Sequence, residues 1–143
     1  MAVKMSAEAE QIMRERFGKD SVLALATEEN GIPSVRYVNA LYENGSFYVI
    51  TYALSNKMKQ IEKNPAVGIA GEWFTSHGKG ISLGFFGKAE NREIAGRLRE
   101  AFASWIDNGH TNLQDENTVI LRVELTDGLL LSHGTRHELH KAL

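Results

Sequence analysis

Cysteine is absent from the 143 residues of this chain. A chain without cysteine forms no disulfide, and it offers no thiolate to a zinc ion, an iron–sulfur cluster or a nucleophilic mechanism. Proline is also scarce, with two residues, and no linker, repeat or low-complexity stretch interrupts the sequence. We therefore expect one domain over residues 1–143, and cysteine usage of this kind is typical of a reducing compartment.

Neither sign of charge dominates, since 16 lysines and arginines face 18 aspartates and glutamates. The resulting net charge of −2 argues against a large polyanionic partner such as duplex DNA, although a local basic site for one phosphate is compatible with it. Hydrophobic runs of bilayer length are lacking, and residues 1–18 have no apolar core of a signal peptide. We expect a cytoplasmic protein that binds neither nucleic acid nor membrane.

Short segments of β-branched, aromatic and alternating apolar residues predict six or seven antiparallel strands. The expected strands are 21–28, 32–42, 46–51, 67–73, 81–90, 118–125 and 129–132. Asn30-Gly31 and Asn44-Gly45 favour hairpin turns that need positive φ, and Asp127-Gly128 is a third predicted turn. His77–Gly80 is interpreted as a loop between strands, in which His77 or Lys79 is a candidate substrate contact.

Three segments show helical periodicity instead. They are residues 6–17 with Ser6 as N-cap, residues 55–63 with Ser55 as N-cap, and residues 93–105 with Asn91 as cap. A polar loop is expected over residues 107–117. Short-spaced hairpins with few helices predict the α+β class, dominated by β structure, with a closed or nearly closed barrel and peripheral helices.

The chemistry-bearing residues gather between Arg36 and Pro65. Arg36 lies on the second predicted strand, and Ser55 and Lys57 open the short helix that follows the third. A helix N-terminus with free N–H groups, a hydroxyl and two cations are the ingredients of a monophosphate site. From spacing alone, the alternative is an ordinary serine-capped helix with solvated lysines.

The order of motifs resembles the FMN-binding core of the pyridoxamine-phosphate-oxidase-like flavoproteins. The matching elements are Arg-x-Val, a hydrophobic-Thr pair and Ser-x-Lys-x-x-Gln-Ile-x-x-Asn-Pro, with further matches at Trp73 and Gly87–Glu90. The resemblance covers roughly residues 26–90. It implies an antiparallel split β-barrel of six to seven strands, with FMN as cofactor, in a homodimer that holds each flavin at the subunit interface.

The resemblance also implies a role for each matched residue. Arg36, Lys57 and the assisting Ser55 would bind the phosphate, Val38 and Asn39 would face the isoalloxazine through backbone groups, Ile50 and Thr51 would lie against the ring and ribityl chain, and Asn56 would complete the set. No metal site is expected, and no side chain stands out as a catalytic acid or base.

Departures from the family pattern limit the expected activity. Full oxidases carry arginine where this chain has Asn56, a lysine near Asn39–Leu41 and a glutamine at Ser82, and their C-terminal segment differs. The resemblance therefore implies an FMN-dependent oxidoreductase of unknown substrate, and not a pyridoxamine-phosphate oxidase.

Two alternatives stay open on the sequence. The first is a non-catalytic flavin-binding module, such as a stress or sensor protein, because the substrate residues are missing. The second is a split barrel that handles haem or uses a deazaflavin, and its haem variant rests on His133, His137 and His140. On a helix, His133 and His137 would share a face, whereas the plainer interpretation of this segment is a solvated tail.

Overall fold

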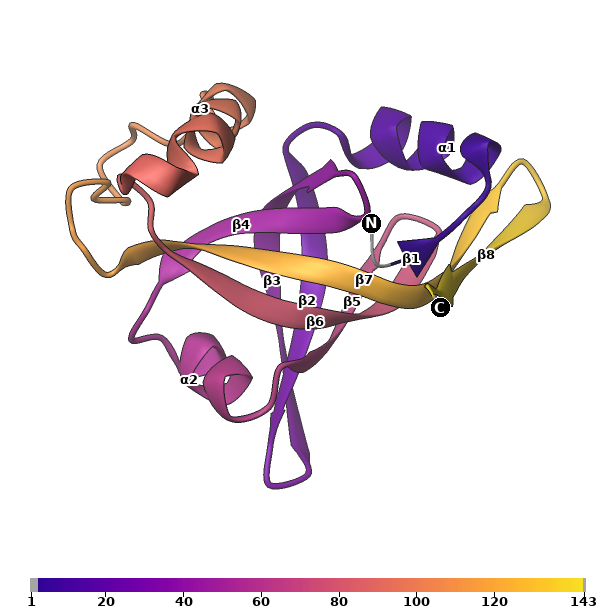
Figure 1. Ribbon diagram of the computed structural model, residues 1–143, viewed down its shortest axis with the longest axis horizontal. Coiled ribbons are helices and arrows are strands. Elements are labelled where there is room, and N and C mark those ends of the chain that lie inside the picture. The colour runs from indigo at the N-terminus through magenta and orange to yellow at the C-terminus, as the bar shows by residue number, and fades with distance from the viewer. Residues whose placement is uncertain (1–2, 143) are drawn as a thin grey trace.

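A single antiparallel sheet that curls into a barrel dominates the computed structural model, which describes residues 3–142 (Figure 1). The strands are β1 (Val3–Lys4), β2 (Ser21–Glu29), β3 (Ile32–Glu43), β4 (Ser46–Tyr52), β5 (Ala66–Gly71), β6 (Phe74–Phe85), β7 (Thr118–Ser132) and β8 (Thr135–Lys141). The helices are α1 (Ala7–Phe17), α2 (Asn56–Lys63), α3 (Arg92–Ala101) and a 3₁₀ turn, η1 (Ala89–Asn91). In the described part of the chain, no helix has the length and apolarity to cross a membrane.

Barrel closure depends on β7. One edge of β7 pairs with β6, and the other pairs with β4 over residues 118–124 and with β8 over residues 128–132. The strand order around the barrel is therefore β7-β4-β3-β2-β5-β6 and back to β7, while β8 and β1 extend the sheet. The β-dominated α+β barrel of six to seven strands predicted from the sequence is confirmed, because six strands close the ring and, in the described part of the chain, β8 and β1 are added outside it.

The barrel is split between β3 and β4. These strands are long, but their ladder contains only three residue pairs, Leu41↔Tyr48, Tyr42↔Phe47 and Glu43↔Ser46. Among the described residues, the part of β3 before Leu41 pairs only with β2, and the part of β4 after Tyr48 pairs only with β7. The facing edges of β3 and β4 consequently leave backbone N–H and C=O groups free on the side that carries Arg36 and Thr51.

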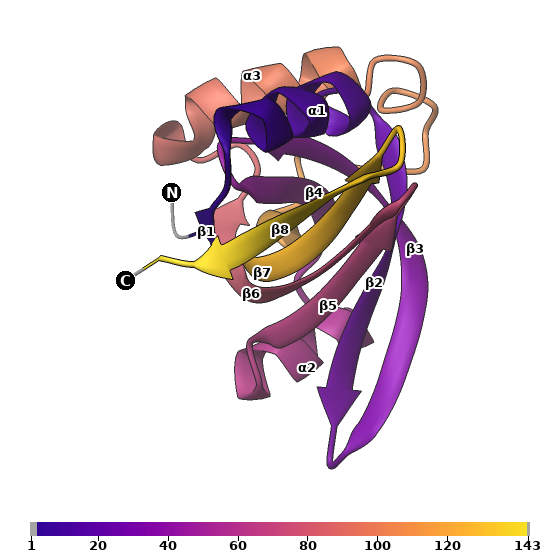
Figure 2. The ribbon, with the colours of Figure 1, turned by 90° about the vertical axis from the view of Figure 1, so that its right-hand side faces the viewer.

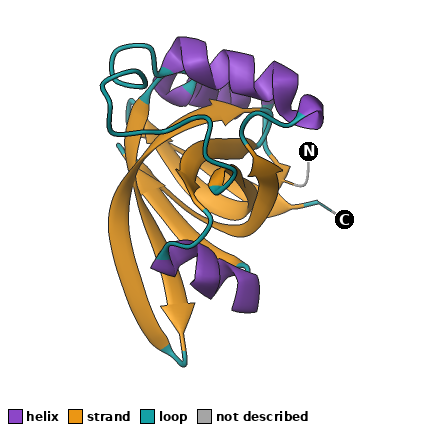
Figure 3. Ribbon diagram, turned by 90° about the vertical axis from the view of Figure 1, so that its left-hand side faces the viewer, coloured by secondary structure: helices purple, strands orange, loops and turns teal. Residues whose placement is uncertain are grey.

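Helices close the two ends of the barrel (Figure 3). Met58 and Ile61 of α2 enter the main core, which fills the barrel, and α1 adds Met13 and Phe17 to it. A second apolar cluster joins α3 to the outer side of β4 and β7. The helix caps predicted at Ser6 and Ser55 are confirmed, because each side chain accepts a hydrogen bond from the backbone N–H three residues later.

The expected loop at His77–Gly80 is wrong, because these residues lie in the middle of β6. Glycine is required there by packing and not by a turn. A Cβ on Gly78 would lie 2.9 Å from Cγ1 of Val123, and one on Gly80 would lie 2.8 Å from Cγ2 of Ile61. The strand predicted over 81–90 accordingly ends at Phe85, and the strand predicted over 67–73 ends at Gly71, before Trp73 in the turn.

Asn91 is also assigned a different role by the structure. Its side chain does not cap α3, and instead donates to the carbonyl oxygens of Leu83 and Phe85, at 3.0 and 2.9 Å.

The C-terminal prediction needs a second correction. Asp127-Gly128 is not a turn, since β7 continues through it, and a Cβ on Gly128 would lie 2.7 Å from the carbonyl oxygen of Thr75. The turn falls at His133-Gly134, where φ is 49° and 77°. His137 and His140 therefore lie on β8, which is neither a helix nor a solvated tail. The described residues contain no group of three or more potential ligands that could hold a metal ion.

Tyr42 fastens α1 to the barrel and supports a stability prediction. Its hydroxyl is buried, donates to Oε2 of Glu10 at 2.5 Å and accepts from the N–H of Gly45 at 3.0 Å. Burial, together with the Glu10 hydrogen bond and charge, raises the pKa of Tyr42. We expect Tyr42→Phe to lower the free energy of unfolding by about 1–3 kcal/mol, because it leaves buried partners unpaired. Urea unfolding would measure this, and an equal loss in the half-buried control Tyr48→Phe would contradict it.

Candidate functional site

The split in the barrel brings two cationic side chains together. Arg36 extends from β3 and Lys57 from the first turn of α2, and they lie near enough for the charge of Arg36 to contribute, after burial, to lowering the pKa of Lys57. Thr51, near the end of β4, accepts a hydrogen bond from Nζ of Lys57 at 2.5 Å. Three of the eight predicted site residues therefore form one group at the α2 end of the barrel.

Among the residues that the structure describes, Arg36 is held by neutral acceptors alone. Its Nη1 donates to Oγ1 of Thr27 at 2.8 Å and to the carbonyl oxygens of Leu25 and Ser34, at 3.2 and 3.4 Å. Thr27 in turn donates its hydroxyl proton to Oε1 of Gln60 on α2. Burial lowers the pKa of Arg36, which reflects the cost of removing a guanidinium from water.

The charges of Arg36 and Lys57 are not balanced by protein carboxylates. Neither residue takes part in an ion pair within residues 3–142. Lys63, on the same helix, does pair with Glu29 at 3.1 Å. Burial, and secondarily the charge of Arg36, lowers the pKa of Lys57. Two half-buried cations without a counter-ion make a site that attracts an anion.

The N-terminus of α2 adds donors at the same place. Ser55 is the N-cap and accepts a hydrogen bond from the Met58 N–H at 3.4 Å, while Asn56 is exposed in the first turn. The N–H groups of the first turn of a helix have no acceptor within the helix, so they can donate to a ligand, and the helix dipole favours a negative group at this end. Ser55 and Asn56 are therefore adjacent to Lys57 on the side expected for a phosphate.

The side chains of the other predicted residues point elsewhere. Val38 is buried in the barrel interior, and Ile50 packs outward against the α3 cluster. Asn39 donates to Oδ1 of Asp20 at 2.9 Å, and the other oxygen of Asp20 accepts from Trp105. The side chains of these three positions therefore do not join the Arg36 and Lys57 group, and a backbone role for Val38 and Asn39 stays a prediction.

A hollow of about 370 Å³ lies beside the β4 part of this group. Residues 50–52 form one wall, and His110, Asn112 and Asp115 of the polar loop form the other. The loop is tied to the barrel by Thr118, whose hydroxyl donates to the carbonyl oxygen of Asn112 at 2.7 Å. There is consequently open space next to the predicted flavin contacts.

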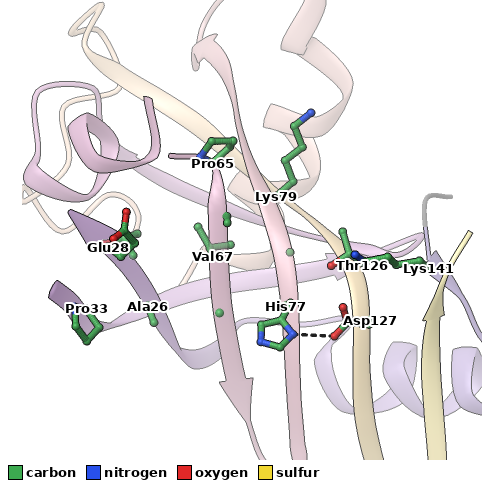
Figure 4. Close-up of a pocket in the computed structure, with 14 residues that line it drawn as sticks. Ala26, Glu28, Pro33, Pro65, Val67, His77, Lys79, Thr126, Asp127 and Lys141 are labelled. Atoms are coloured by element: carbon green, nitrogen blue, oxygen red, sulfur yellow. Dashed lines mark hydrogen bonds and ion pairs between the residues drawn. The ribbon is translucent and has the colours of Figure 1, made fainter. Parts of the chain in front are cut away.

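A separate hollow, of about 620 Å³, lies on the outer face of β2, β5 and β6 and includes none of the eight predicted residues (Figure 4). Its floor is formed by small residues, among them Ala26, Ala66 and Gly68. At one side, Nδ1 of His77 lies 2.8 Å from Oδ1 of Asp127. His77 and Lys79 thus line this outer face, where we expected a loop near the flavin edge.

The same outer face carries exposed apolar side chains. Val35 and Tyr37 point outward from β3, and Tyr37 is 80% exposed. They pair in register with Ala26 and Ala24 of β2, which pair in turn with Gly68 and Ala70 of β5. Figure 2 shows β3, β2, β5 and β6 side by side. In this view α1 and α3 lie at the top of the molecule and do not cover the face of these strands. The face therefore consists of an apolar ridge beside a shallow trough.

The lowered pKa of Lys57 predicts a stability effect in the ligand-free protein. Lys57→Met removes a poorly solvated ammonium next to Arg36, so we expect a gain in unfolding free energy of up to about 1 kcal/mol, since partly exposed charges are screened. Because the folded chain releases the Lys57 proton first, the unfolded state binds more protons in the alkaline range, and wild-type stability rises there. The gain should shrink as the pH rises toward the ordinary lysine pKa of about 10.4. Urea unfolding across this range would contradict the assignment if the gain were constant.

The chain matches the family model described as pyridoxamine 5'-phosphate oxidase over residues 9–131. No curated protein matches it.

Solved structures with a similar fold come from several bacteria. A FAD-binding protein from Mesorhizobium loti is 14% identical with a TM-score of 0.66, and the match covers 99% of this chain and 100% of that one. A NimC/NimA family protein from Clostridium acetobutylicum is 22% identical, with coverages of 91% and 93% and a TM-score of 0.64. A heme binding protein from Mycobacterium smegmatis is 13% identical, with coverages of 84% and 52% and a TM-score of 0.64. At these identities the likeness establishes the fold.

Proposed function

This chain belongs to the pyridoxamine 5'-phosphate oxidase family, and from that premise we propose that it is a flavoprotein that holds the phosphate of FMN between Arg36 and Lys57. The observation that carries the proposal is the pair of half-buried cations without a carboxylate partner at the open side of the barrel. A phosphate monoester would supply the missing negative charge, and the N-terminus of α2 would add backbone donors.

The chain's own residues would bind and orient the cofactor. Ser55 and Asn56 would lie at the phosphate, and Thr51 would keep the Lys57 ammonium directed into the site. The free backbone edge at Val38 and Asn39 would take the polar rim of the isoalloxazine ring, with Ile50 and Thr51 beside the ring and ribityl chain. The bound flavin would supply hydride or electron transfer, and the protein would supply position and electrostatics.

The number of cations in the site favours FMN, which has one terminal phosphate, over a dinucleotide such as FAD. The group contains two cations, which suits one terminal phosphate, and Asn56 adds no further charge. The Mesorhizobium loti relative is described as a FAD-binding protein, so FAD is the natural competitor in the experiment.

Gel filtration after mixing with FMN, FAD or riboflavin tests the proposal directly. We expect a flavin absorbance band to co-elute with the protein for FMN, and less for the other two. A colourless protein peak with FMN would overturn the proposal. With FMN bound, reduction by NADH or NADPH would support an oxidoreductase, whereas retention of oxidised flavin with both donors would favour a binding or sensor role.

We also propose that two copies pair through the outer face of β3, β2, β5 and β6. The ridge formed by Val35 and Tyr37 lies beside the trough over Ala24, Ala26 and Gly68, so a two-fold axis would place each ridge in the trough of the other copy. Exposed apolar side chains of this size on an uncovered sheet face favour burial against a partner. The open edge of β3 would then lie at the border between subunits, which is where the family resemblance expects the flavin.

A further inference from the structure

The guanidinium of Arg36 is oriented through a buried hydroxyl. Thr27 is 2% exposed and lies on the inward face of β2, one inward position beyond Leu25, the register partner of Arg36. Its Oγ1 accepts from Nη1 of Arg36 at 2.8 Å. A buried hydroxyl with one arginine partner fixes the direction of that arginine only if its own proton is directed elsewhere.

That proton goes to α2. Thr27 donates it to Oε1 of Gln60, one turn along the helix from Lys57. Because a hydroxyl has a single proton, this bond directs a lone pair of Thr27 toward Arg36. The relay Gln60–Thr27–Arg36 thereby links the helix that carries one cation to the strand that carries the other.

We propose that Thr27 and Gln60 are positioning residues that set the Arg36 guanidinium for the flavin phosphate without neutralising it. The inference rests on the proposed FMN site. A carboxylate at position 27 would hold Arg36 directly, and one at position 60 would add a negative charge behind Thr27, but either would compete with the phosphate for the charge of Arg36. A hydroxyl and an amide leave the full positive charge of Arg36 for the ligand. The two neutral residues therefore orient the guanidinium without lowering its affinity for the phosphate.

The test compares FMN with riboflavin, which lacks the phosphate. We expect Thr27→Val to weaken FMN about tenfold with little change for riboflavin, because the hydrogen bond to a charged group is lost. Thr27→Ser, which keeps the hydroxyl, should restore the wild-type ratio of the two affinities. Gln60→Glu should lower FMN affinity more than Thr27→Val, because it adds a carboxylate to the relay.

Ser46→Ala is a matched control. Ser46 is also buried, and its hydroxyl accepts from Nε of Arg122 at 3.0 Å, but Arg122 pairs with Glu124 and lies outside the site. Its loss should leave the FMN-to-riboflavin ratio unchanged. If Thr27→Val does not fold, Gln60→Leu is the second variant. It breaks the relay at a partly exposed residue of α2 and should lower the ratio of FMN to riboflavin affinity in the same way.

The outcomes separate the two levels of the argument. If wild type prefers FMN but Thr27→Val and Gln60→Leu keep that preference, the relay is overturned and the phosphate site stands. If both flavins weaken equally in Thr27→Val, Thr27 has only a structural role and the inference is wrong. If wild type itself does not distinguish FMN from riboflavin, the phosphate site fails and the relay fails with it.

Discussion

Replacing Arg36 and Lys57 together with methionine is expected to weaken FMN binding by about two orders of magnitude or more. Each cation would give the phosphate a charge-assisted hydrogen bond of about 1.5–3 kcal/mol, and both side chains are already partly desolvated, so little hydration opposes the contact. Methionine keeps the length and apolar stem of both residues. The measurement is a fluorescence titration of each protein with FMN and with riboflavin.

Riboflavin affinity should change little in the double variant, because the lost partners face the phosphate. Lys59→Met with Lys63→Met is the matched control, since it also removes two positive charges, both from exposed positions of α2, the helix that carries Lys57. It should leave FMN affinity close to that of wild type, apart from a small long-range contribution. Equal losses of FMN and riboflavin in the Arg36 and Lys57 variant would show that these residues maintain the fold and do not bind phosphate.

Tyr37→Asp is expected to convert the proposed dimer into a monomer. Tyr37 is the most exposed of the large apolar side chains described and lies on the ridge of the outer sheet face. Burying an unpaired carboxylate at the centre of an interface opposes association strongly, so the dimer dissociation constant should rise by about a hundredfold or more. Sedimentation of wild type and variant at micromolar concentration measures this directly.

The same variant tests whether the flavin site needs both copies. If the cofactor lies between subunits, the monomeric variant should lose most of its FMN affinity although Arg36 and Lys57 are intact. Gln11→Arg, on the exposed side of α1, is a control for a surface charge change and should leave the dimer intact. A wild-type protein that sediments as a monomer would rule out the dimer, and a monomeric variant with full FMN affinity would place the whole site in one chain.

Local chemistry in the sequence was sufficient for several elements of the fold. Asn30-Gly31 and Asn44-Gly45 have the positive φ values that their hairpins require, and Ser55 caps α2 as expected. In each case the deciding interaction lies within a few residues of the chain. The same reasoning failed where glycine serves distant packing, because Gly78 makes room for Val123 and Gly128 for the backbone of Thr75. Nothing near those glycines in the sequence distinguishes them from turn glycines.

The candidate site divides in the same way. Arg36, Ser55 and Lys57 could be predicted because they belong to a motif whose spacing sets a helix N-terminus beside a strand. Thr27 was missed because its role depends on Gln60, which lies 33 positions away in the chain. The alternation of Leu23, Leu25 and Thr27 does mark an inward-facing hydroxyl. Such a polar residue at the end of an apolar face is the one signal that could have indicated it.

The late position of β7 has consequences for how the chain folds. The second edge of β4 and the second edge of β6 both pair with β7, which begins only at Thr118. During synthesis, a chain that has emerged only as far as α3 therefore presents two unpaired strand edges. Pairing of β7 with strands so distant in sequence also gives a high contact order, which is typical of slow folding. Truncation before residue 118 should accordingly yield aggregates, and this protein is expected to depend on chaperones more than a helical chain of the same length.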